Sequence, residues 1–325
     1  MPLRLSRPLR VALFAALAAT ASLCAAAAAD AKSVPVDLRV VGSDGVVLGD
    51  YTQYTDSVSV KTDRKADCFG PGTEGSGAKV DVKGKTALGA VIDGAKAGDT
   101  DLKPVSVTDA FDFGLGICGI GGEVAPDTGF WYLKQDHVAS QTGGDLTKVK
   151  KNDAVTWFLD SDFADAPPAE LELEAPAGVL FDTPTEVQVF EYADDGTRTP
   201  AAGVEVTGAS APTGPDGTTE ISLTTAYQTI VASRDGAITD EAQICAGDEA
   251  RDCPKQPGTI IGGSSKPDKI KGTKGPDSID AGGANDKIDS RDGEVDHVDC
   301  GGGKKNKVKA DREDEIAKNC EKVKF

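Results

Sequence analysis

A short repeat near one end constrains the fold of this 325-residue chain more than any other feature. Between residues 260 and 311, a polar residue is followed two positions later by a branched aliphatic residue, and this pair recurs every nine or ten residues. A period this short predicts stacked turns of one small unit, each adding one aliphatic side chain to a narrow interior column. The polar members are Asp268, Asp277, Asp286, Asp296 and Asn306, and the aliphatic members are Ile270, Ile279, Ile288, Val298 and Val308.

Together with the glycine-rich runs between the pairs, this pattern resembles the RTX, or haemolysin-type, calcium-binding nonapeptide, G-G-x-G-x-D-x-U-x, in which U is aliphatic. The resemblance implies a parallel β-roll or solenoid over residues 254–325. It also implies Ca²⁺ held between successive turns by aspartate carboxylates and backbone carbonyls, the oxygen ligands that this cation prefers. The positions that match the metal-binding residues of the repeat are Asp268, Asp277, Asp286, Asp296, Gly275 and Gly283.

We expect one or two calcium sites in this repeat, around Asp268, Asp277 and Asp286, with the last turn acting as a cap. The alternative is a solenoid that keeps the same shape without the ion.

The first residues of the chain have the pattern of a secretory signal peptide. Three arginines precede an alanine-rich apolar run, and small residues at 27–29 provide a cleavage site before Asp30. We therefore expect residues 1–29 to be removed on export. Lipidation at Cys24 is disfavoured because a leucine precedes that cysteine where a small residue is required. No later stretch is long and apolar enough to span a membrane.

Six cysteines remain after residue 29, an even number that suits an oxidising compartment. Six cysteines allow fifteen pairings, of which one pair within each domain is the simplest. Zinc is the alternative, but the spacing offers no CxxC motif and the chain has only two histidines. We expect disulfides between neighbours in sequence: Cys68 with Cys118, Cys245 with Cys253, and Cys300 with Cys320.

Acidic residues are unevenly distributed along the chain, whose net charge is −18 at pH 7. Residues 30–253 contain 17 Lys and Arg against 39 Asp and Glu, whereas residues 254–325 contain 15 against 14. The negative balance of the first part argues against nucleic acids and anionic membranes as its partners. Solubility alone also accounts for such acidity in secreted proteins.

Residues 30–165 have the pattern of an α+β domain. Alternation of apolar and polar residues predicts a hairpin over residues 34–48, and a further short strand follows at residues 57–60. Thr86 is a candidate cap for a helix that begins at Ala87. A glycine-rich loop carrying Cys118 is expected next, and then two aromatic strands around residues 130–133 and 149–159.

The order of hairpin, helix, Phe-Trp-Tyr-Leu strand and final Asp153-Ala-Val-Thr-Trp157 strand resembles the transcobalamin-like C-terminal domain, a β-grasp-type module. In that family the module covers one side of a bound cobalamin, so the resemblance implies a small-ligand site on the aromatic strands. Its candidate ligand-binding residues are Trp131, Tyr132 and Trp157. The alternative is that these aromatic residues form a packed sheet face.

After a proline break at residues 166–168, residues 166–253 contain short strands separated by Gly- and Asp-rich turns. This spacing predicts an antiparallel β-sandwich. The segment resembles the immunoglobulin-like and carboxypeptidase-regulatory-like spacers of surface proteins, which implies that it positions other domains and has no site of its own. The whole chain is therefore expected to be a mainly β, multidomain protein.

The sequence offers little for catalysis. Two histidines are few for acid–base chemistry, and HExxH, GxSxG, phosphate-loop and dinucleotide-binding motifs are absent. We expect a secreted or cell-surface, non-enzymatic binding or adhesion protein with a Ca²⁺-stabilised repeat and an unknown extracellular partner, not a nucleic acid. The alternatives are a small-ligand binder that uses the first domain and an extracellular enzyme whose carboxylates converge only in the folded chain.

Overall fold

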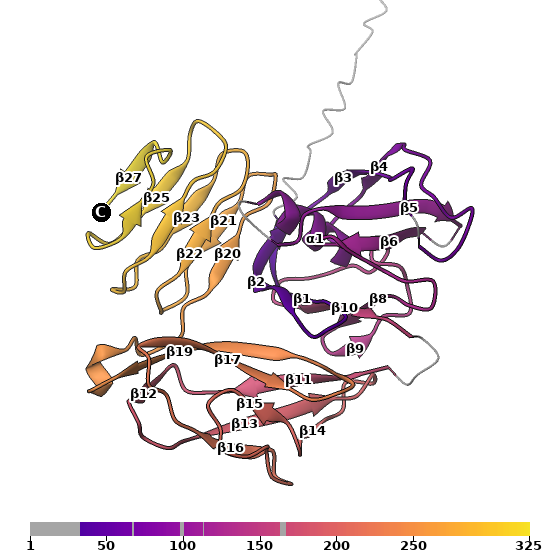
Figure 1. Ribbon diagram of the computed structural model, residues 1–325. Coiled ribbons are helices and arrows are strands. Elements are labelled where there is room, and N and C mark those ends of the chain that lie inside the picture. Colours follow the sequence, from indigo (N-terminus) through magenta and orange to yellow (C-terminus); the bar gives the residue numbers. More distant parts are fainter. Residues whose placement is uncertain (1–32, 67, 98–100, 113, 163–166) are drawn as a thin grey trace, which may run out of the picture. The chain divides into compact units, whose positions relative to one another are not determined.

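The computed structural model describes residues 33–66, 68–97, 101–112, 114–162 and 167–325 (Figure 1). It is mainly β, with 45% strand and 4% helix, as the sequence predicts. The predicted signal peptide of residues 1–29, the residue Cys24 and the first residue of the proline break lie outside the described residues.

The predicted hairpin is confirmed as β1 (Val34–Val41) and β2 (Val47–Thr55), which pair antiparallel. On its other side, β1 pairs in parallel with β10 (Ala154–Asp160), and β10 pairs antiparallel with β8 (Phe130–Gln135). The short strand β9 (Val138–Ala139) extends this sheet beyond β8. The two predicted aromatic strands are thus neighbours in one sheet.

The predicted helix is also confirmed, as α1 (Ala87–Lys96). The hydroxyl of Thr86 accepts a hydrogen bond from the backbone N–H of Gly89 at 2.9 Å, which satisfies one of the free donors at the start of the helix. Leu88 and Val91 are fully buried in the core that the helix shares with β1 and β10.

The structure corrects the prediction for residues 114–120, which form a strand instead of a glycine-rich loop. Cys118 lies in β6 (Gly114–Ile120), where glycines alternate with larger apolar residues. A Cβ atom on Gly119 would lie 2.9 Å from the carbonyl oxygen of Glu123, so this glycine allows the next strand to approach. The other strands of this region are β3 (Val58–Lys61), β4 (Lys79–Val82), β5 (Val105–Phe111) and β7 (Glu123–Val124).

Residues 169–247 form two sheets that enclose one core. One sheet has the order β14-β13-β11-β18, with β16 also paired to β13, and the other has the order β12-β19-β17-β15. The strands are β11 (Ala169–Glu174), β12 (Gly178–Leu180), β13 (Thr185–Tyr192), β14 (Arg198–Pro200), β15 (Glu205–Val206), β16 (Thr218–Ile221), β17 (Tyr227–Ser233), β18 (Ala237–Ile238) and β19 (Asp240–Gly247). A 3₁₀ helix, η1 (Ala250–Asp252), follows.

The prediction of purely antiparallel pairing in this region is wrong in two places. Strand β11 pairs in parallel with β18, and β12 pairs in parallel with β19. Both parallel partners are short strands of two or three residues that lie at a sheet edge, and their pairing has no hairpin signal in the sequence. The predicted alternation does hold for the core, to which both sheets contribute buried aliphatic side chains: Leu171, Val189, Ile221, Ile230 and Ile244.

The repeat forms a two-sided solenoid of short parallel strands. Alternate strands belong to opposite sheets, so β20, β22, β24 and β26 stack on one side and β21, β23, β25 and β27 on the other. Each full coil therefore takes two repeats. The strands are β20 (Ile260–Gly262), β21 (Lys269–Lys271), β22 (Ser278–Asp280), β23 (Lys287–Asp289), β24 (His297–Asp299), β25 (Lys307–Lys309), β26 (Glu315–Ile316) and β27 (Lys322–Lys324).

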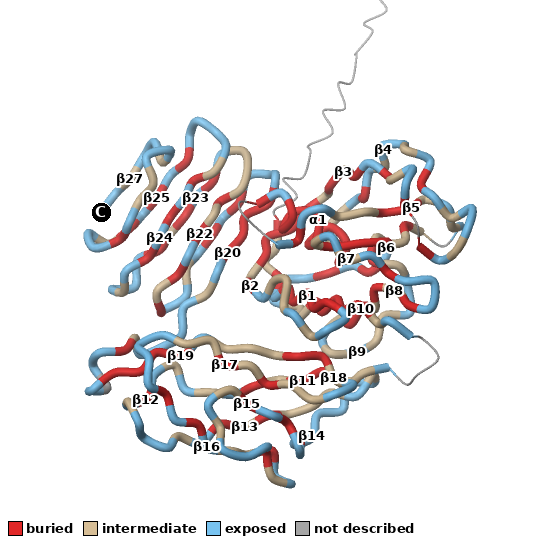
Figure 2. Tube along the Cα trace, viewed as in Figure 1, coloured by how far each residue is buried: buried red, intermediate tan, exposed pale blue. Residues whose placement is uncertain are grey.

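The predicted interior column of aliphatic side chains is present. The aliphatic residues that the repeat pairs with its polar residues are each only 2% exposed and belong to one hydrophobic cluster. Buried residues follow one another at the centres of the solenoid strands, while the corners are more exposed (Figure 2). The column consists of Ile270, Ile279, Ile288, Val298 and Val308, and Ile261 extends it by one strand.

The first coil of the solenoid continues the sheet that contains β2, β1, β10 and β8, which the sequence did not predict. Strand β20 pairs in parallel with β2, with Thr52 opposite Ile261. Gln53, fully buried, donates to the carbonyl of Gly263 at 3.0 Å, and the Tyr54 hydroxyl donates to the carbonyl of Lys269 at 3.1 Å. The β20 edge of the solenoid is therefore paired, whereas β21 is the end strand of the opposite sheet.

A buried arginine connects β1 to both sheets of the second region. The guanidinium of Arg39 donates to Glu170 on β11 at 2.5 Å and to Asp240 on β19 at 2.6 Å. It also donates to the carbonyl of Leu171 at 3.0 Å. Its planar fork satisfies these acceptors together, which a lysine could not do.

All three predicted disulfides are present: Cys68–Cys118, Cys245–Cys253 and Cys300–Cys320, with Cα–Cα distances of 5.3, 5.6 and 5.2 Å. Within the residues that the structure describes, no helix has the length and apolar character that crossing a membrane requires.

We predict that Ile288→Ala lowers the free energy of unfolding of the solenoid by about 2–5 kcal/mol, because it removes a buried side chain from the column. The neighbouring Lys287→Ala, which changes an exposed side chain of the same strand, is expected to change it by no more than about 0.5 kcal/mol. Urea unfolding followed by circular dichroism measures both. Equal effects of the two substitutions would show that the column does not stabilise the solenoid.

Candidate metal centre

Buried polar residues occupy the turns of the solenoid, each directly before a strand. They lie two positions before the inward aliphatic residue, so the turn brings the polar side chain toward the interior while the strand buries the aliphatic one. None of them is more than 9% exposed. They are Asp268, Asp277, Asp286, Asp296, Asn306 and Asp314.

One oxygen of most of these side chains joins its turn to the preceding coil, 18 to 20 residues earlier. Asp286 Oδ1 accepts from the backbone N–H of Asp268 at 2.8 Å, and Asp296 Oδ1 accepts from that of Asp277 at 2.8 Å. The same bond continues the two ladders at three further acceptors: Asp277 from Thr259, Asn306 from Asp286, and Asp314 from Asp296. A glutamate extends one ladder over a shorter separation of 15 residues, where Glu321 accepts from Asn306.

In the first two turns, a neighbouring residue satisfies the rest of the carboxylate. The backbone N–H of Ser264 donates to Asp268 Oδ2 at 2.7 Å, and its hydroxyl lies 3.0 and 3.1 Å from the two oxygens. The Ser33 hydroxyl also donates to Asp268. Similarly, Thr273 donates its backbone N–H and its hydroxyl to Asp277, each at 2.6 Å. Both carboxylates are therefore occupied by protein donors.

In the next two turns, one carboxylate oxygen has no partner. Oδ2 of Asp286 and Oδ2 of Asp296 are buried and accept no hydrogen bond. The cause is the residue four positions earlier, whose backbone N–H donates to Oδ2 in the first two turns. Before Asp286 the corresponding N–H of Gly282 donates to Asp280 instead, and before Asp296 that of Asp292 donates to Asp311. Neither of these residues has a hydroxyl that could replace it. A buried carboxylate oxygen without a partner is strongly unfavourable.

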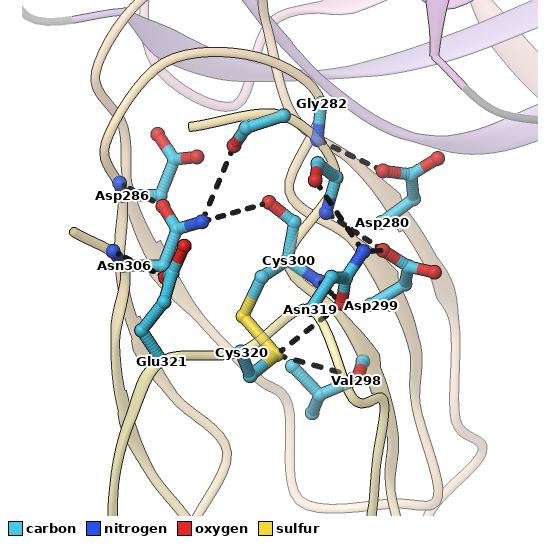
Figure 3. The surroundings of a disulfide bond; sticks show 12 residues. Asp280, Gly282, Asp286, Val298, Asp299, Cys300, Asn306, Asn319, Cys320 and Glu321 are labelled. Carbon is cyan, nitrogen blue, oxygen red and sulfur yellow. Dashed lines mark hydrogen bonds between the residues drawn. A yellow bond between two sulfur atoms is a disulfide. The ribbon is translucent and has the colours of Figure 1, made fainter. Parts of the chain in front are cut away.

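The fifth turn has a hydrogen-bond donor where the other turns have the second carboxylate oxygen. The side-chain nitrogen of Asn306 donates to the carbonyls of Cys300 and Gly302, both at 3.2 Å, while its Oδ1 continues the ladder (Figure 3). In this turn an amide N–H₂ group thus takes the place of the second carboxylate oxygen. The side chain reaches backbone carbonyls six and four residues earlier, which an unprotonated carboxylate would repel.

Burial raises the pKa of both incompletely paired carboxyls. Desolvation is the largest cause, and it raises the pKa of Asp286 to about 7 and that of Asp296 to about 7. Neighbouring carboxylates add to the effect, with Asp268 and Asp280 acting on Asp286. Near neutral pH each position therefore favours a proton or a cation over a free negative charge.

The predicted metal residues thus divide into two kinds. Asp286 and Asp296 present a free oxygen, whereas Asp268 and Asp277 are already hydrogen bonded. Gly275 and Gly283 lie in the turns as predicted, where Gly275 N–H donates to the Thr273 hydroxyl at 3.3 Å and Gly283 N–H to the Ser264 carbonyl at 2.8 Å.

The sequence reasoning missed four residues of these turns: Ser264, Thr273, Asp314 and Glu321. The signal for the two acids was present, because each stands two positions before an aliphatic residue, Ile316 or Val323, at a shorter spacing. Among the residues that the structure describes, no group of three or more His, Cys, Asp or Glu side chains converges on one point.

The candidate ligand-binding aromatics of the first domain lie mainly in its core. Trp131 is 5% exposed and Trp157 is 3% exposed. Tyr132 is half-buried and donates its hydroxyl to Asp194 at 2.7 Å, while its ring packs on Phe158 with 5.0 Å between the centroids. The two indoles therefore stabilise the sheet, and a ligand would reach them only through an opening in the core.

Comparison with known proteins leaves this chain without an assigned relative: no family model, curated protein or solved structure matches it.

We predict that, in the presence of a chelator, the solenoid is more stable at acidic pH than at neutral pH. The unfolded carboxyls titrate near 3.8 and the folded ones near 7, so the folded state binds the protons more tightly. The stability that this protonation provides is present below about 3.8 and is lost as the pH rises through about 7. Thermal unfolding across this range measures the effect.

Other carboxylates also titrate, so the matched measurement is the difference between the native chain and Asp286→Asn/Asp296→Asn. The double variant is expected to lose the part of the pH dependence that falls between these two pKa values. Identical pH profiles of the two proteins would contradict the assignment.

Proposed function

We propose that this chain is an extracellular, non-catalytic binding protein whose C-terminal solenoid is completed by Ca²⁺ at Asp286 and Asp296. The observation that carries this proposal is the pair of buried Oδ2 atoms without partners, which lie in successive turns of the solenoid. A divalent cation would neutralise the unpaired carboxylates and would also take backbone carbonyl oxygens as ligands.

The available ligands suit a hard cation. Calcium is bound by carboxylate and backbone carbonyl oxygens, and both occur in these turns. The carbonyls that Asn306 contacts lie six and four residues before it, and the same offsets from Asp286 fall on Asp280 and Gly282. We assign Asp286 and Asp296 as the carboxylate ligands. At Asp268 and Asp277 the backbone N–H groups and hydroxyls of Ser264 and Thr273 donate to the carboxylates in place of a cation.

The arrangement of the chain supports an extracellular role. Three disulfides suit an oxidising compartment, and residues 1–29 have the pattern of a signal peptide. Extracellular calcium modules bind with dissociation constants of about 10⁻⁴–10⁻³ M, so the sites would fill after export and remain empty at cytosolic calcium levels. The solenoid resembles an RTX roll, while residues 30–165 and 166–253 resemble a β-grasp-type domain and an immunoglobulin-like spacer.

A binding role is favoured over catalysis because the chain has only two histidines and no catalytic motif. A small-ligand site on Trp131 and Trp157 is a weaker proposal than a role for the solenoid surface, because both indoles are buried.

We predict that Ca²⁺ stabilises the native chain at neutral pH, by about 1.4 kcal/mol per site at ten times the dissociation constant. The double variant Asp286→Asn/Asp296→Asn is expected to lose this response. In chelator it is expected to be at least as stable as the native chain, because its amides can donate as Asn306 does. The matched control is Asp299→Asn/Glu313→Gln, which removes the same charge from two exposed side chains of the solenoid.

Thermal unfolding with EGTA and with millimolar Ca²⁺ makes this comparison. A calcium response that survives in the double variant, or that disappears in the control, would refute the assigned sites.

We also predict that Thr273→Gly adds no calcium position at Asp277, because the backbone N–H groups of Thr259 and residue 273 still donate to its two oxygens. Isothermal titration calorimetry is expected to show the calcium stoichiometry of the native chain. A higher stoichiometry in a folded variant would show that the threonine hydroxyl alone excludes the ion.

A further inference from the structure

One face of the solenoid carries two rows of lysines. The outward positions of the sheet formed by β21, β23, β25 and β27 align across the strands, as the pairing register shows. The first row is Lys269, Lys287, Lys307 and Lys322, and the second is Lys271, Asp289, Lys309 and Lys324. The seven lysines of these two rows are all exposed.

The single acid in these rows does not break the positive surface. Both oxygens of Asp289 accept hydrogen bonds from the guanidinium of Arg291, at 2.7 and 2.8 Å, and Lys309 lies 3.7 Å away. Its charge is therefore compensated locally. Five of the lysines, those at 271, 287, 307, 322 and 324, have no carboxylate within ion-pair distance among the described residues.

The lysines follow the sheet and not the nine-residue repeat. The position after the polar residue that accepts the ladder bond, or after Asp268 in the first turn, is lysine at 269, 287, 307 and 322. In the intervening turns it is Ser278, His297 and Glu315. Those intervening residues belong to the opposite sheet, where Asp280 and Asp299 also face outward. The acidic and basic residues after residue 253 are similar in number, but the basic ones are concentrated on one face.

This pattern does not serve stability. Neighbouring strands lie about 4.8 Å apart, and like charges directly opposite one another on a sheet are destabilising. Four lysines in one row on four adjacent strands therefore repel one another. A partner that carries negative charge would remove that repulsion. Solubility alone does not require such a row, because a surface with interspersed acidic and basic side chains is equally soluble.

We propose that this lysine face binds an acidic polysaccharide, a linear polymer with regularly spaced anionic groups. The two rows are about 7 Å apart and extend about 14 Å across the four strands, a narrow stripe that one extended polymer chain can cover. This interaction surface goes beyond the proposed function, because it does not involve the calcium-binding turns.

The composition of the face favours such a polymer over other anionic partners. Single-stranded nucleic acids are bound by basic grooves with aromatic stacking platforms, and the outward positions here hold no aromatic residue. They also hold no arginine, which supplies bidentate contacts to phosphate and bases. Membrane-binding faces add apolar side chains that enter the interface, and these two rows have none.

The test measures binding of the full chain to dextran sulfate, with uncharged dextran as the matched probe, at constant calcium. The native chain is expected to bind only the sulfated polymer. Lys287→Gln/Lys307→Gln/Lys322→Gln is expected to weaken binding roughly tenfold or more and to lower the slope of log K against log salt by about 2. The control Lys65→Gln/Lys79→Gln/Lys151→Gln, which removes the same charge from exposed lysines elsewhere, is expected to bind as the native chain does.

Several outcomes would overturn the proposal: equal losses in the two triple variants, tighter binding to single-stranded DNA than to dextran sulfate, or binding only to vesicles with an anionic lipid. A change of oligomeric state in the first variant alone would instead identify a second copy of the chain as the partner. The calcium response of both triple variants is expected to be native, so failure here is distinguishable from failure of the calcium sites.

Discussion

The solenoid depends on a buried carboxylate that accepts a backbone N–H from the preceding coil. A three-residue strand contributes one aliphatic side chain to the interior, which is too little to fix the conformation of its turn. The bond from Asp268 N–H to Asp286, like its equivalents, orders the turn and holds successive coils in register. Because the acceptor is buried, this bond is strong, but its second oxygen must also find a partner.

The chain satisfies this second oxygen in different ways along the solenoid. The backbone N–H groups of Ser264 and Thr273 serve near β20, where strand β2 pairs with the edge. An asparagine amide serves in the turn beside the Cys300–Cys320 disulfide. Only the middle turns at Asp286 and Asp296 lack a protein donor. A proton or a cation would complete these two turns.

The sequence predicted the parts of the fold that depend on local pattern. The nine-residue period predicted the aliphatic column, Thr86 marked the start of the helix, and the order of the cysteines predicted the disulfide pairs. It could not predict the pairing of β2 with β20, because some 200 residues separate them and no local signal marks the partner. Nor did it show that Ser264 and Thr273 close two expected calcium positions, since a match to the aspartate ignores the residue four positions earlier.

The same periodicity allows the repeat to carry two separate properties. Within one repeat the polar residue lies in the turn, the next residue faces solvent, and the one after it faces the interior. Substitution at the solvent position leaves both the ladder and the column intact. Since alternate repeats belong to opposite sheets, lysine in every second repeat charges a single face. The charge of that face can therefore change without any change in the buried turns, so the two properties can be altered independently.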